Sequence, residues 1–165
     1  MSVISRAAVG EPIAHRAQRG STLVEILVAV TIISLVLTAV SAMISMSVKL
    51  AESNEKKQLA LQKAEEAMEF FRKERVISSW YSFSTPLTDG ATYCVSSLPE
   101  DVASLSAKLG GCSNSDTMEA ARYSFQRQAV VNFNSVNRLN IQIEMLWNDG
   151  SKAKNLVLEQ SFENY

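Results

Sequence analysis

The most restrictive feature of this sequence is an uncharged run of 23 residues near its N-terminus, from Ile26 to Val48. A helix rises about 1.5 Å per residue, so the run would be roughly 34 Å long, enough to cross a hydrocarbon layer of about 30 Å. Glu25 directly precedes the run and Lys49 directly follows it. The sequence therefore predicts a membrane-spanning helix with a carboxylate near its start.

Residues 1–20 have the composition of a processed leader. They contain three arginines and one acidic residue, a net charge of +2, and show no period that could bury a core. A basic segment before an apolar run favours a cytoplasmic N-terminus and export of the C-terminal remainder of the chain. Residues 21–165 carry 13 basic and 16 acidic side chains, so the exported part is mildly acidic. We therefore expect no direct nucleic-acid binding.

The helix is predicted to continue well beyond the apolar run. Neither Gly nor Pro, the residues that most readily interrupt a helix, occurs between Ser21 and Thr85. After the run, apolar residues recur among charged ones at spacings of three and four, which is typical of an amphipathic helix that packs one face on a domain. These apolar residues are Leu50, Leu59, Leu61, Ala64, Ala67, Met68, Phe70 and Phe71. One helix over about 21–76 is predicted, with a membrane-spanning half (21–48) and an amphipathic half (49–76).

The C-terminal third has the alternation of β-strands. Apolar and polar residues alternate over 123–130 and, most cleanly, over 139–147. Residues 148–151 predict a hairpin turn, and 154–162 supply the returning strand. An antiparallel sheet of three to four strands has one face to bury, and the amphipathic helix can cover it. The predicted fold class is α+β, with residues 77–165 as a β-rich head outside the cytoplasm.

The segment between helix and sheet contains the two cysteines. The patterns predict a short strand over 91–96, a short helix from Pro99 to the glycines at 110–111, and a polar loop over 113–119. In an exported chain, Cys94 and Cys112 lie in an oxidising space and are expected to pair. The loop of about 18 residues would then be stabilised by about 3 kcal/mol. Two unrelated buried thiols are the alternative.

The residues around the start of the apolar run resemble the processing signal of type IV pilins and pseudopilins, the class III prepilin signal. The resemblance rests on Gly20, Thr22, Leu23, Glu25 and the apolar run. In this family a prepilin peptidase cuts after the glycine and methylates the new N-terminus, and the apolar helix remains as an assembly element. The resemblance implies cleavage after Gly20 and methylation of Ser21, where the family usually has Phe.

The family also implies a location and partners. The chain is expected in the cytoplasmic membrane as a single-pass protein with its head outside, and then in a pilus or pseudopilus. It would be a non-catalytic subunit, a minor pilin or pseudopilin, of a type IV pilus, type II secretion or DNA-uptake filament. The implied partners are prepilin peptidase, other pilin or pseudopilin subunits, an inner-membrane assembly platform, and membrane lipid before assembly. No cofactor is implied.

Glu25 has a physical role in such a filament. A carboxylate in hydrocarbon costs roughly 3 kcal/mol or more unless it finds a partner. Glu25 lies four residues after Ser21, on the same helix face, so a freed Ser21 amine is within reach. Among packed helices, the amine of one subunit can also meet the Glu25 carboxylate of its neighbour and fix the register. We therefore predict that Glu25 is an assembly residue.

Two other origins of the apolar run stay open. It could be a conventional secretory signal, with small residues at 40–42 before a cut at Met43, or an uncut signal anchor. The chain would then be a secreted or anchored binding or adhesion module unrelated to pili. Its exposed aromatic residues would be Trp80, Tyr81 and Trp147, although burial of these side chains is the simpler interpretation.

Catalysis is not expected. The only histidine, His15, lies in the predicted leader, so its removal excludes Ser/His and Cys/His nucleophile arrangements. There is no Gly-rich phosphate loop, and the acidic residues are isolated or lie on a solvated helix face. The acidic residues considered are Glu65, Glu66, Glu69, Asp89, Asp116 and Asp149. We predict no catalytic residue and no metal site.

Overall fold

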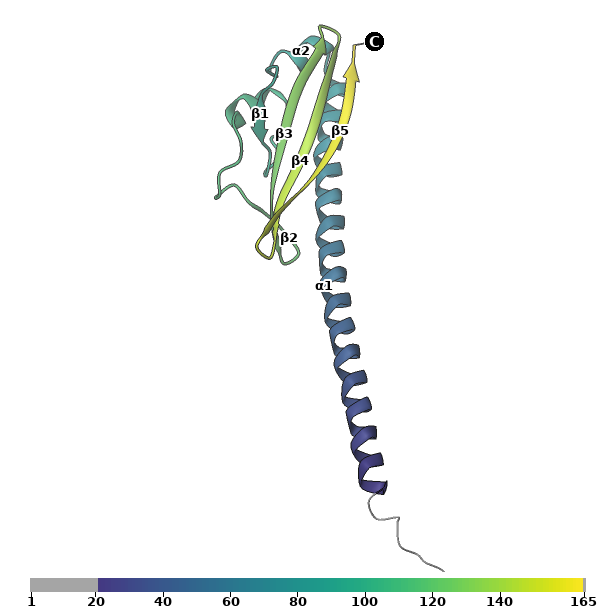
Figure 1. The fold of residues 1–165 in the computed structure, drawn as a ribbon. Coiled ribbons are helices and arrows are strands. Elements are labelled where there is room, and N and C mark those ends of the chain that lie inside the picture. Colours follow the sequence, from purple (N-terminus) through teal and green to yellow (C-terminus); the bar gives the residue numbers. More distant parts are fainter. Residues whose placement is uncertain (1–20, 165) are drawn as a thin grey trace, which may run out of the picture. The chain divides into compact units, whose positions relative to one another are not determined.

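The computed structural model describes residues 21–164 (Figure 1). The predicted leader, with Gly20 at its end, lies outside the described residues. The chain divides between Val48 and Lys49 into two units. Helix α1 runs from Ser21 to Ile77 through both units, so the long N-terminal helix expected from the sequence is present.

The second unit, called the head unit here (residues 49–164), places one antiparallel sheet against the second part of α1 (Figure 1). The sheet order is β1-β3-β4-β5, and β2 pairs with β3 outside that row. The predicted α+β class is confirmed. The other elements are α2 (Trp80–Ser84), β1 (Thr92–Cys94), the 3-10 helix η1 (Ala103–Lys108), β2 (Met118–Ala120), β3 (Tyr123–Ser135), β4 (Arg138–Asp149) and β5 (Lys152–Glu163).

Strands β3, β4 and β5 form a continuous meander, as their alternating patterns predicted. Ile143 lies opposite Ala129 on one side and Leu158 on the other, so inward residues form rows across the sheet. The β4–β5 turn contains Gly150 at φ +65°, a left-handed conformation that glycine adopts without steric cost. The fully buried inward residues of β3 and β4 are Phe125, Arg127, Ala129, Val131, Leu139, Ile141, Ile143 and Met145.

Two short elements depart from the predicted pattern. Strand β2 ends the segment that was expected to be a polar loop, because the tight turn at Ala121 (φ +54°) folds it back onto β3. Three residues are too few to show a period of two in the sequence. Helix α2 is a single turn started by Ser79, whose hydroxyl accepts a hydrogen bond from the Ser82 amide.

The face of α1 that packs on the sheet is centred on alanines. Its fully buried residues recur at spacings of three and four. They are Ala60, Ala64, Ala67, Met68 and Phe71. Leu50 and Leu61, which were predicted on this face, are 61% and 40% exposed. Because each residue advances about 100° around a helix, burial of Ala60 turns Leu61 away from the sheet, and the small alanines let the helix approach closely.

Arg127 connects three segments inside the head unit. Its side chain is buried, yet its Nε donates to the Val95 carbonyl at 2.8 Å and its Nη1 to the Lys63 carbonyl of α1 at 2.7 Å. The Glu66 carboxylate lies 4.0 Å away. Burial lowers the pKa of Arg127, and the Glu66 charge opposes that shift. The guanidinium thus satisfies two carbonyls while linking α1, β3 and the segment after β1.

A second polar connection joins the first turns of α1 in this unit to the β4–β5 turn. Lys56 Nζ lies 3.0 Å from Asp149 Oδ1 and 3.4 Å from Glu52 Oε1, and Ser53 Oγ donates to Asp149 Oδ2 at 3.1 Å. The hydrogen bond to Asp149 is the main cause that raises the pKa of Lys56. Hydrogen bonds from Lys56 and then Ser53 lower the pKa of Asp149.

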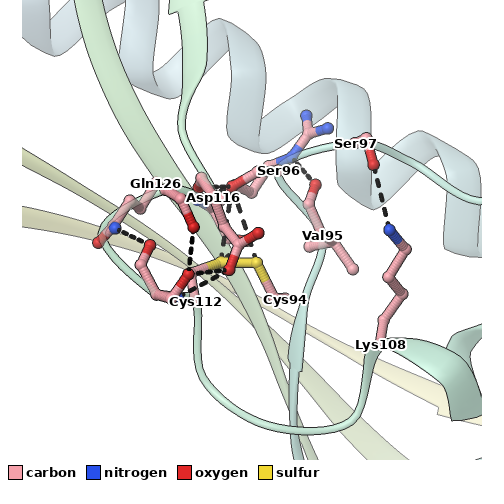
Figure 2. The surroundings of a disulfide bond; sticks show 11 residues. Cys94, Val95, Ser96, Ser97, Lys108, Cys112, Asp116 and Gln126 are labelled. Atoms are coloured by element: carbon pink, nitrogen blue, oxygen red, sulfur yellow. Dashed lines mark hydrogen bonds between the residues drawn. A yellow bond between two sulfur atoms is a disulfide. The ribbon is translucent and has the colours of Figure 1, made fainter.

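Cys94 and Cys112 form the disulfide that the sequence predicted (Figure 2). The loop that it closes contains η1, where a short helix was expected. Four residues after Cys112, the Asp116 carboxylate accepts hydrogen bonds from the hydroxyl and the amide of Ser113, which lower the pKa of Asp116. Ser96 Oγ donates to the Asp116 carbonyl at 2.6 Å, so both ends of the loop are held together (Figure 2).

Candidate functional site

Residues 22–48 of α1 form an uninterrupted helix whose side chains are all exposed. Among residues 21–164, α1 is the one helix that is long and apolar enough to cross a membrane. An exposed apolar stretch of this length needs lipid or other helices around it, since water solvates it poorly. This stretch, called the apolar segment here, is therefore the candidate functional site.

The hydroxyl groups of the apolar segment from Thr31 to Ser47 are satisfied within the helix. Ser34 Oγ, for example, donates to the Val30 carbonyl at 2.7 Å, and Ser41 Oγ donates to the Leu37 carbonyl at 2.9 Å. Such back-bonding to the preceding turn gives each of these hydroxyl protons a partner in an apolar environment. The hydroxyl residues that do this are Thr31, Ser34, Thr38, Ser41, Ser45 and Ser47.

Five of these residues form one stripe, which was not predicted from the sequence. Their spacings alternate between three and four, so they lie on one face of the helix with a heptad period. They are Thr31, Ser34, Thr38, Ser41 and Ser45, called the hydroxyl stripe here. The regular spacing of these residues is visible in the sequence. It was missed because the run was interpreted by its lack of charge alone. Small residues on one face allow another helix to approach closely.

Glu25 is the single acidic residue of the apolar half of α1. It is the fifth residue of the helix, its side chain is exposed, and it makes no ion pair with any described residue. Ser21 is the first residue of α1, one helical turn earlier. A carboxylate near a helix N-terminus is favoured by the positive end of the helix dipole. The predicted cleavage residue Gly20 lies outside the described residues.

A comparison with known families bears directly on this segment. The family described as "Prokaryotic N-terminal methylation motif" matches residues 15–41, a range that includes Gly20, Ser21 and Glu25. The chain carries a type IV pilin-like prepilin signal. No curated protein and no solved structure matches the chain.

Proteins with the pilin motif are generally structural, are processed by prepilin peptidase and assemble with other pilin subunits. The apolar helix and the motif of this pilin-like chain fit membrane anchoring with an extracellular head. The match ends at residue 41, within the apolar segment, so the head unit has to be interpreted from its own structure.

The head unit holds the other residues that the sequence singled out. Trp80 and Trp147 pack against the core, whereas Tyr81 is 77% exposed. Glu66 and Glu69 lie on the exposed face of α1 and pair with Lys63 and Arg72. In the part of the chain that the structure describes, no three His, Cys, Asp or Glu side chains are grouped to hold a metal ion.

Proposed function

We propose that this chain is a non-catalytic filament subunit, a minor pilin or pseudopilin of a type IV pilus, type II secretion or DNA-uptake machine. The observation that carries the proposal is the methylation motif at residues 15–41, which overlaps the uninterrupted helix of the apolar segment. A simple anchor needs length and apolarity alone. The motif supports cleavage after Gly20, which a simple anchor would not need, and the small residues on one face of the helix support packing against other helices.

In this proposal the chain first enters the cytoplasmic membrane with its head outside. Prepilin peptidase cuts after Gly20 and methylates Ser21, and the apolar segment remains in lipid until an inner-membrane assembly platform transfers it to the filament. The disulfide between Cys94 and Cys112 is consistent with export, because such bonds persist in oxidising compartments.

Assembly then replaces lipid around the apolar segment with helices of other subunits. The hydroxyl stripe supports this step, since its small side chains permit close contact and its protons are already bonded within the helix. Glu25 would pair with the Ser21 amine of a neighbouring subunit, which removes the cost of leaving a carboxylate alone in an apolar environment. The head unit is displayed on the outside of the filament.

The mature N-terminus tests the proposal directly. The chain is expressed in a host that has prepilin peptidase, purified from membranes, and its N-terminal peptide is identified by mass spectrometry. We expect the peptide to begin at Ser21 and to carry a methyl group. A peptide that begins at Met43 would identify a secretory signal, and one that begins at Met1 a plain anchor. Either of these results would overturn the proposal.

A further inference from the structure

The positive charge of the head unit is concentrated at one end. This end, called the basic end here, comprises the first turns of α1 in the unit, the β2–β3 turn and the β4–β5 turn. Its charged residues are Lys49, Glu52, Glu55, Lys56, Lys57, Glu119, Arg122, Asp149, Lys152 and Lys154. Six are basic and four acidic, a net charge of +2. The rest of residues 49–165 holds seven basic and eleven acidic residues, a net charge of −4.

Contacts between the elements bring these charges together. Arg122 of the β2–β3 turn lies 3.1 Å from Glu55 of α1, and Asp149 of the β4–β5 turn lies 3.0 Å from Lys56. Both turns therefore meet α1 within one helical turn, at the same end of the sheet (Figure 1). Lys49 precedes Lys56 by two helical turns and lies on the same side of the helix.

Most of the positive charge at this end is free. Lys56 and Arg122 are paired with carboxylates. Four further lysines are exposed and make no ion pair with any residue in the described range 21–164, namely Lys49, Lys57, Lys152 and Lys154. Their charge is available to an anionic partner.

Two amphipathic aromatic residues accompany the lysines. Tyr123 and Trp147 are half-buried and line a cleft of about 720 Å³ together with Lys56 and Arg122. Both cations lie 5.1 Å from the centre of the Tyr123 ring. Trp and Tyr beside Lys and Arg are the residues that the membrane–water interface favours, because their rings are apolar and their tips polar.

We propose that the basic end binds the anionic phospholipid headgroups of the membrane into which α1 inserts, and so holds the head on the surface before assembly. The inference rests on the proposed function, since it requires the apolar segment to span the membrane. Lys49 directly follows Val48, the last residue of that segment, so the basic end begins where the hydrocarbon-spanning run ends. Lysines beside the end of a spanning helix are attracted to anionic lipid within about a Debye length.

An acidic surface on another protein would attract the same lysines. The covalent position of the basic end favours lipid, because its first residue adjoins the apolar segment and stays beside the membrane for as long as that segment is inserted. The binding of protein is therefore treated as a contrary outcome of the test.

The test uses the full chain in vesicles of phosphatidylcholine, with or without phosphatidylglycerol. Exposed lysines are acylated with an amine-reactive reagent, and the rate at each lysine is measured by mass spectrometry. We expect phosphatidylglycerol to slow the reaction of Lys152 and Lys154 by roughly fivefold. Lys73 and Lys108, which are exposed but lie outside the basic end, should react equally in both vesicles. High salt should remove the difference.

Matched variants separate the basic end from the total charge of the chain. In the double variant Lys152→Gln/Lys154→Gln, phosphatidylglycerol should protect Lys57 less than in the native chain. In the double variant Lys73→Gln/Lys108→Gln, which removes the same charge elsewhere, the protection of Lys57 should be unchanged. Equal effects of the two variants would overturn the proposal.

Three other outcomes are contrary. Equal acylation rates in both vesicles would overturn the inference. It would also be overturned if the lysines were protected in vesicles of pure phosphatidylcholine at high protein density, because that result would indicate a protein partner. Alkaline extraction tests insertion independently. Release of the chain from both vesicles would overturn the proposed function together with the inference, whereas retention with equal rates would overturn the inference alone.

Discussion

The apolar segment and the head unit satisfy their side chains in opposite ways. In the apolar segment every side chain is exposed, and the hydroxyls from Thr31 to Ser47 bond to their own helix. The head unit buries a core of its own, and polar groups such as Arg127 and the Lys56–Asp149 pair connect its segments. One region therefore needs partners to cover it, and the other does not.

The difference predicts where substitutions act. Changes in the apolar segment should alter insertion or assembly while the head stays folded, because no core residue of the described chain lies before Lys56. Changes in the head unit should alter its stability. A variant in one region that also changed the property assigned to the other would contradict this division.

The largest effect is expected for Glu25→Ala. Under the proposed function, the variant leaves the Ser21 amine of a neighbouring subunit without its carboxylate in an apolar environment, so incorporation into filaments should be lost. The measurement is the amount of chain in the sheared filament fraction relative to the amount in the membrane. The head should unfold at the same urea concentration as the native chain.

The control for this variant is Glu65→Ala, which removes an exposed carboxylate from the part of α1 in the head unit. It should assemble like the native chain. If Glu25→Ala assembled normally, Glu25 would not be an assembly residue.

The next largest effect is expected where α1 packs on the sheet. Phe71→Ala removes a fully buried ring and should lower the free energy of unfolding by about 4 kcal/mol. Leu61→Ala, on the same helix but 40% exposed, should cost less than about 1 kcal/mol. Urea unfolding followed by near-UV circular dichroism measures both. Equal costs would show that the buried face of α1 is not the one described.

Arg127→Met should have a smaller effect. Methionine fills much of the space, but the carbonyls of Val95 and Lys63 lose their donor, which should cost about 2 to 3 kcal/mol. The matched control is Arg122→Met, whose guanidinium is exposed and forms a surface pair with Glu55, so it should cost less than about 1 kcal/mol. A native-like stability of Arg127→Met would mean that the buried guanidinium contributes no net stability.

The sequence predicted the parts of the fold that a repeated signal marks. The lack of Gly and Pro, with an apolar run followed by an amphipathic pattern, indicated α1. The alternation of apolar and polar residues, followed by the turn residues Asp149-Gly150, indicated the β4–β5 hairpin. The predicted buried face of α1 was wrong at Leu61. A large apolar residue such as leucine is the usual sign of a core position, whereas here the small residue Ala60 is the one that is buried. Arg127 could not be identified, since its carbonyl partners come from distant segments and carry no side-chain signature.

The candidate site was predictable to a different degree. The residues at the start of the apolar segment carry a recognisable motif, so Gly20, Ser21 and Glu25 could be singled out from the sequence. The basic end could not, because its lysines come from three separated stretches of chain. These stretches meet only in the folded head, where Asp149 contacts Lys56 and Arg122 contacts Glu55.

The smallest effect is expected from pH, and it concerns the head unit alone. The folded-state pKa of Asp149 lies below its ordinary value of 3.8, so the carboxylate stabilises the fold above that pH. This contribution is lost as pH falls through the lowered pKa. The pKa of Lys56 is raised above 10.5, so its contribution is complete below that value and is lost only at higher pH.

Asp149→Asn should therefore weaken the acid dependence of the free energy of unfolding, measured in urea between about pH 6 and pH 2. Part of the dependence should remain, because hydrogen bonds from Ser104 and Ser113 also lower the pKa of Asp101 and Asp116. The same substitution should leave membrane insertion of the apolar segment unchanged, since Asp149 belongs to the head unit. An unchanged acid dependence in Asp149→Asn would show that the Lys56–Asp149 contact does not stabilise the head.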